Sequence, residues 1–112
     1  MSIPNATNEE VKSYLENYLI YKQMLDADEY AQNYSGSEPQ ICDRIFLRAK
    51  MGEIERFIRS LPVCREQTLL FSHFLGGHSV EFCGEMMYVS RRTAYRILNS
   101  AIRLAAEYYN AK

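Results

Sequence analysis

The chain has 112 residues with a formal net charge of −1, and 47% of its residues are hydrophobic, which predicts one globular domain able to bury its own core. No apolar run approaches the roughly 18 residues that a membrane span requires, and residues 1–10 lack the apolar stretch of a signal peptide. We therefore expect a cytoplasmic protein with no membrane partner.

The pattern along the chain predicts five helices and no strand, an all-α fold. The first helix is predicted to begin after Thr7, because Glu10 follows at the spacing of a capping box, and to extend to about Tyr34. Apolar and aromatic residues at spacings of three and four define its inward face: Val11, Tyr14, Leu15, Tyr18, Leu19, Tyr21 and Leu25. This helix is acidic, and residues 33–39 read as a linker.

Two further helices are predicted before the glycine pair at 76–77. The second should span about 39–60, because Pro39 suits a first helical turn. Its inward residues are expected to be Ile41, Ile45, Ile54, Phe57, Ile58 and Leu61. The third should begin at Leu61–Pro62 and end at Gly76–Gly77. Its apolar residues are Leu69, Leu70, Phe71 and Phe74.

Residues 79–102 have the pattern of two helices joined by a tight turn. Ser79 and Ser90 are each placed to cap the helix that follows. Gly84 is expected to allow close helix packing, since a glycine inside a helix otherwise costs roughly 1 kcal/mol. The expected inward residues are Val80, Cys83 and Met87 in the first helix and Ala94, Ile97, Ala101 and Leu104 in the second.

The second of these helices opens with residues suited to DNA: Arg91, Arg92, Thr93, Tyr95 and Arg96. A guanidinium group can donate two parallel hydrogen bonds to a phosphate or to a guanine edge. The alternative is the solvated face of an ordinary amphipathic helix. The order of glycine, capping serine and arginines favours a helix-turn-helix, whose second helix lies in the major groove.

The charges divide unevenly along the chain. Residues 1–43 hold two basic and eight acidic residues, a net charge of −6, whereas residues 44–112 hold eleven and six, a net charge of +5. A basic segment suits the neutralisation of phosphates. An acidic segment has to be kept away from the duplex or turned toward a protein partner.

Cysteines and histidines give no sign of catalysis or metal binding. Cys42, Cys64 and Cys83 form no closely spaced pair, so we expect reduced, buried thiols rather than disulfides or a zinc site. His73 and His78 have no accompanying carboxylate pair or nucleophile. We expect no enzyme activity, no cofactor and no metal.

Several separate motif positions in the C-terminal half follow one another in a characteristic order and spacing. They are Leu61-Pro62, Arg65-Glu66-Gln67, Gly76-Gly77, Ser79-Val80-Glu81, Gly84, Val89-Ser90-Arg91-Arg92 and Ile97. Through these motifs the C-terminal half of the chain resembles region 4 of the sigma-70 family. The resemblance implies binding of a promoter element similar to the −35 hexamer.

Residue roles also follow from the resemblance. Base-reading positions of the family correspond to Arg91, Arg92, Thr93, Tyr95 and Arg96. Phosphate contacts would come from Ser79, Ser90 and the helix start around Arg65.

The sequence departs from this family at several positions. Ala94 stands where a larger branched residue is usual, Phe82 where a charged residue is frequent, and Tyr95 where arginine is common, so base preference does not transfer. No segment resembles the separate region with which a complete sigma factor melts the −10 element. The chain is more similar to small standalone sigma-like regulators of bacteria and their phages.

The sequence thus predicts an acidic N-terminal helix and linker at 1–38 and a DNA-binding domain at 39–112. Double-stranded DNA is the expected partner, with RNA polymerase as a further partner. The N-terminal helix could pack in its own domain, form a homodimer or dock on a polymerase or phage protein. Two other functions stay open: the small terminase subunit of phage DNA packaging, and a sigma-like interaction module that binds no DNA.

Overall fold

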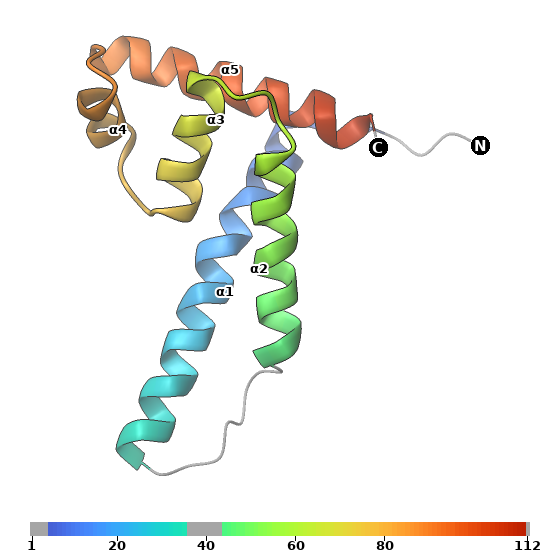
Figure 1. Cartoon of the computed structure of the whole chain (residues 1–112), viewed down its shortest axis with the longest axis vertical. Helices are drawn as coiled ribbons and strands as arrows, with labels where there is room; N and C mark the ends of the chain where they lie inside the picture. Colours follow the sequence, from blue (N-terminus) through green and yellow to red (C-terminus); the bar gives the residue numbers. More distant parts are fainter. Residues whose placement is uncertain (1–4, 36–43, 112) are drawn as a thin grey trace.

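The computed structural model describes residues 5–35 and 44–111, and in these ranges the chain is all-α, with no strand. The elements are α1 (Asn8–Ser35), α2 (Arg44–Arg59), α3 (Arg65–Leu70), the π-helical η1 (Phe71–Leu75), α4 (Val80–Met86) and α5 (Arg91–Asn110). Helices α1 and α2 run antiparallel, and α5 lies across one end of that pair (Figure 1). None of the helices in the described ranges has the length and apolar character that a membrane crossing needs.

The start of α1 confirms the predicted capping box. The backbone N–H of Glu10 donates to Thr7 Oγ1 at 3.2 Å, and the N–H of Thr7 donates to Glu10 Oε1 at 3.3 Å. The preceding residue, Ala6, exchanges two hydrogen bonds with the side chain of Asn110, at 2.8 and 3.1 Å. This exchange fixes the beginning of α1 to the end of α5.

The inward face of α2 differs from the sequence prediction at one position. Ile45 was expected to face inward, but it is 81% exposed, and Leu47 is buried in its place. Two residues correspond to about 200° around a helix, so the two side chains lie on opposite sides. Ile54, Phe57 and Ile58 are buried as expected. The predicted helix start at Pro39 and the predicted inward position Ile41 lie outside the described residues.

The third helix begins at Arg65, so its predicted start at Leu61–Pro62 is wrong. The reason is the buried Gln67 side chain, whose amide donates to the carbonyl oxygens of Ile58 and Leu61 at 3.0 and 3.1 Å. These bonds satisfy the carbonyl groups of Ile58, in the last turn of α2, and of Leu61, just beyond it. Residues 60–64 form a non-helical connection between α2 and α3. The end of the helix at Gly76–Gly77 is as predicted, and Gly77 has a φ of 73°.

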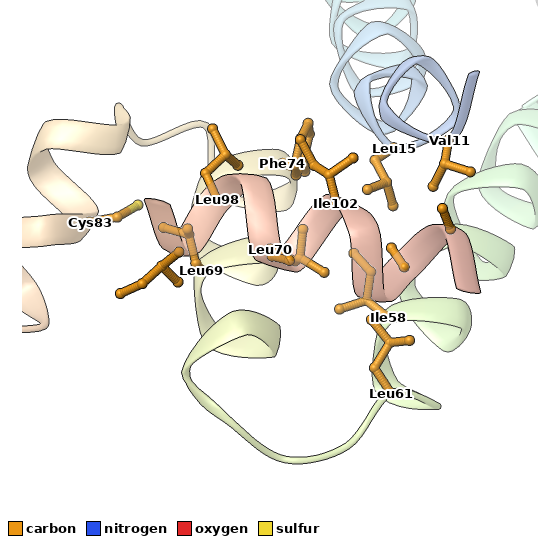
Figure 2. Close-up of a cluster of buried hydrophobic side chains, with 14 of the residues drawn as sticks. Val11, Leu15, Ile58, Leu61, Leu69, Leu70, Phe74, Cys83, Leu98 and Ile102 are labelled. Carbon is orange, nitrogen blue, oxygen red and sulfur yellow. The ribbon is translucent and has the colours of Figure 1, made fainter. Parts of the chain in front are cut away.

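Within the described ranges, one buried cluster joins side chains of α1, α2, α3, η1, α4 and α5. Side chains from these helices gather around α5 in Figure 2, among them Leu15, Ile58, Leu70 and Ile102. Small residues of α5, such as the buried Ala101, allow its neighbours to approach closely. The cluster therefore holds one side of α5 in the core and leaves the other side of that helix exposed to solvent.

Candidate nucleic-acid interface

Helix α4 is short, and its first turn is capped as the sequence predicted. Ser79 Oγ accepts a hydrogen bond from the backbone N–H of Phe82 at 3.1 Å. Val80 and Cys83 are buried, while Met87 is only half-buried at the end of the helix. The hydroxyl hydrogen of Ser79 is not used by this cap, so the exposed side chain can still donate to a phosphate oxygen.

The turn between α4 and α5 has a defined backbone. Tyr88 adopts a φ of 58°, in the left-handed region, and the N–H of Val89 donates to the carbonyl of Gly84 at 3.0 Å. Ser90 then caps α5 by accepting from the N–H of Thr93 at 3.2 Å. The two helices are therefore joined by a tight turn, as the sequence predicted.

At Gly84, α4 packs closely against α5. A Cβ atom added at this glycine would lie 2.9 Å from the Cβ of Ala94, closer than two such atoms can pack. Both residues are buried. The expected packing role of Gly84 is confirmed, and it sets how α4 lies against the start of α5.

The outward side of α5 carries the predicted arginines. Arg91, Arg92 and Arg96 are all exposed, whereas Ala94 and Ile97 are buried in the core. In the described part of the chain, neither Arg92 nor Arg96 forms an ion pair with a carboxylate. Their guanidinium groups can therefore contact a ligand without first breaking an ion pair.

Arg91 is different because it is paired with Glu81 of α4. Its Nε lies 3.3 Å from Glu81 Oε1, and the Tyr95 hydroxyl donates to the same oxygen at 2.7 Å. The hydrogen bond from Tyr95 is the main cause that lowers the pKa of Glu81 below its ordinary 4.5, and it raises the pKa of Tyr95 above 10.0. The structure thus brings three side chains from two helices together. Sequence reasoning placed Glu81 in a motif but did not predict this contact.

Of the remaining predicted residues, Ser90 and Thr93 lie at the start of α5, whereas Arg65 lies on α3. The Ser90 hydroxyl donates to Thr93 Oγ1 at 3.0 Å, so the Thr93 hydroxyl is the one left free to donate outward. Arg65 lies apart on α3, where its Nε is 3.6 Å from Glu66 of the same turn. Among the described residues, Arg65 forms no hydrogen bond or ion pair with α4 or α5. Its phosphate contact stays a prediction.

Asn99 is a candidate that the sequence prediction missed. It is exposed on α5, seven residues after Arg92 and three after Arg96. This helical spacing places it on the same side as the arginines and could have identified it from the sequence. With Arg103 and Lys12 it lines a hollow of about 320 Å³ between α5 and α1. An asparagine amide can pair with an adenine edge in the major groove.

Both histidines make contacts close to the Gly76–Gly77 turn. His73 Nδ1 lies 2.8 Å from the carbonyl oxygen of His78, and the His78 ring stacks on Phe82 with a centroid distance of 4.6 Å. Within the described ranges no three His, Cys, Asp or Glu residues come together as metal ligands. Burial raises the pKa of the Cys83 thiol, which disfavours the reactive thiolate, and Cys64 is half-buried. Cys42 lies outside the described residues.

Comparisons with protein-family models, curated proteins and solved structures find no match for this chain.

Proposed function

We propose that this protein binds double-stranded DNA in a sequence-specific manner through α4 and α5 and thereby regulates transcription. One observation carries the proposal. The first turns of α5 present Arg92 and Arg96 to solvent without carboxylate partners, beside a short capped helix that packs tightly across the same end of α5. Exposed arginines at the start of the second helix are what major-groove contact by a helix-turn-helix requires.

The two kinds of DNA contact can be divided between the helices. Phosphate oxygens suit the hydroxyl groups of Ser79 and Thr93, which remain able to donate after the capping bonds are made. Base edges suit Arg92 and Arg96, because a guanidinium recognises guanine through two parallel hydrogen bonds. The sigma region 4-like interpretation adds RNA polymerase as the partner of the flanking helices.

One observation favours a second candidate function, a protein-interaction module that binds no DNA. Apolar side chains around α4 and the turn are exposed: Phe82 by 42%, Met86 by 65% and Tyr88 by 96%. Together with Cys83 and Met87, two of them line a hollow of about 250 Å³. Such a surface suits apolar contact with another protein better than contact with phosphate.

The test begins with selection of bound sequences from a random duplex pool, followed by titrations of the selected duplex over a range of salt concentrations. We expect affinity to fall steeply with salt, because phosphate contacts release counterions. Arg92→Ala should weaken binding by about 1–3 kcal/mol and relax the preference at one base pair.

Arg48→Ala is the matched control. It removes the same charge from α2, where Arg48 lies 3.9 Å from Glu29, and α2 begins at the end of the α1–α2 pair that is remote from α5 (Figure 1). It should leave base preference unchanged. If both variants lose the same affinity for every duplex sequence, Arg92 contributes only through its charge and not through a base contact. A wild-type protein that binds no duplex even at low salt would contradict the proposal and favour the protein-interaction module.

A further inference from the structure

We infer that Glu81 is a specificity-determining residue of the DNA-binding surface, although it need not touch DNA itself. The inference rests on the proposed function and assigns Glu81 one task within it. Its carboxylate holds Arg91 and Tyr95 as an oriented pair at the start of α5, and it cancels the charge with which Arg91 would otherwise bind any phosphate.

The geometry shows why the three side chains act together. Glu81 Oε1 accepts from the Tyr95 hydroxyl at 2.7 Å and lies 3.3 Å from Arg91 Nε, while the Arg91 guanidinium stands over the Tyr95 ring at 5.8 Å. Each pair among the three is therefore in contact. Glu81 comes from α4 and the other two from α5, so the cluster also bridges the two helices.

The contact leaves part of Arg91 available. A guanidinium has five N–H donors, and the ion pair with Glu81 is recorded at Nε, 3.3 Å from Oε1. The terminal amino groups can still donate to a base edge, and the Arg91 side chain is 75% exposed. A base with two acceptors can satisfy these oriented donors, whereas a phosphate approaching the same place meets the negative charge of Glu81. The arrangement penalises sequence-independent binding more than base recognition.

Stability does not explain this cluster. Glu81 and Arg91 are both well exposed, at 40% and 75% of their side chains, and exposed ion pairs contribute little to folding. Glu85 lies one turn further along the same helix and is also exposed, but in the described part of the chain it forms no ion pair or side-chain hydrogen bond. This makes Glu85 a matched control for the charge of α4.

The experiment compares Glu81→Gln with Glu85→Gln in the full chain. Dissociation constants are measured for the selected duplex and for a scrambled duplex of equal length, at several salt concentrations. Glu81→Gln should bind the scrambled duplex about 3- to 10-fold more tightly, with a salt slope steeper by about one, because Arg91 becomes free to contact a phosphate. Its preference for the selected duplex should fall by a similar factor.

Glu85→Gln should raise affinity for both duplexes by the same factor and leave their ratio unchanged. Tyr95→Phe, which removes the donor to Glu81 and keeps the ring, should reduce the ratio without a change in net charge. Melting temperatures of all variants identify any that fail through unfolding.

The outcomes separate the two proposals. If the wild type prefers its selected duplex but Glu81→Gln changes the ratio no more than Glu85→Gln does, the role of Glu81 is overturned and DNA binding stands. If the wild type binds no duplex even at low salt, or binds with an affinity that does not change with salt, both proposals are overturned.

Discussion

Arg91, Arg92 and Arg96 share a helix but differ in what surrounds them. Arg91 is paired with Glu81, whereas Arg92 and Arg96 are exposed and, within the described residues, have no carboxylate partner. Removing Arg92 therefore exposes no buried charge and breaks no internal ion pair. Loss of binding in the Arg92→Ala variant can be attributed to the DNA contact itself.

Tyr14 provides a test of the core that does not involve DNA. Burial, followed by the nearby Glu53 carboxylate, raises its pKa to about 12. Its ring lies against Phe57 and Tyr109, with centroid distances of 5.8 and 5.4 Å. A titration monitored by tyrosinate absorbance should show a late transition near this pH. Tyr14→Phe should remove that transition, whereas Tyr88→Phe, at a fully exposed ring, should not.

The sign of the effect on stability follows from the raised pKa. Tyr14 keeps its proton in the folded state at pH values where the unfolded chain, with an ordinary pKa of 10.0, has begun to lose it. Its contribution to stability is therefore complete below pH 10 and is lost as the pH rises toward 12. A midpoint of urea unfolding that falls equally in the wild type and in Tyr14→Phe over this window would contradict the assignment.

At the scale of elements, the sequence predicted helix boundaries wherever the signal is local. The caps at Thr7, Ser79 and Ser90 depend on residues at most three positions away, and all three are confirmed. The start of α3 was mispredicted because Gln67 bonds to carbonyl groups six and nine residues earlier. Glu81 and Tyr95 are 14 residues apart, so their contact required the turn geometry as well as the pattern.

The packing of α4 on α5 makes a specific prediction for Gly84→Ala. The new Cβ would lie 2.9 Å from the Cβ of Ala94, which cannot move without a shift of its helix, so we expect a loss of about 1–3 kcal/mol in the free energy of unfolding. Gly52→Ala is the control, since its Cβ would meet only the flexible end of Arg56 at 3.1 Å. Urea unfolding measures both.

A second substitution can relieve the clash at this position. The double variant Gly84→Ala/Ala94→Gly removes the opposing Cβ and should recover part of the lost stability, despite the cost of a glycine inside α5. Equal stability of Gly84→Ala and Gly52→Ala would mean that the two helices are not held this closely in solution.

At the scale of the whole molecule, the acidic and basic segments are partly matched to each other. The buried Asp28 accepts from Arg44 Nε at 2.7 Å, and Arg48 of α2 lies 3.9 Å from Glu29 of α1. These contacts form between α1 and α2, toward the end of that pair that is remote from α5 (Figure 1). Acidic residues of α1 thus pair with α2 while the arginines of α5 stay exposed, an arrangement that the charge totals alone could not predict.

The domain division and the partners of the N-terminal helix stay predictions. Val11 and Leu15 of α1 belong to the same buried cluster as Ile58 and Ala105, so the first half of α1 packs with the helices that follow it. Its later residues Ile20 and Met24 are exposed and remain available to a second copy or to RNA polymerase.

Amide chemical shifts recorded while the selected duplex is added to ¹⁵N-labelled protein would decide whether α4 and α5 form the DNA-binding surface. We expect the largest changes at residues 79–82 and 90–99 and almost none at 44–50, because the exposed arginines and caps lie on α4 and α5. Shifts confined to the α1–α2 pair, or no shifts at low salt, would contradict DNA binding through these helices.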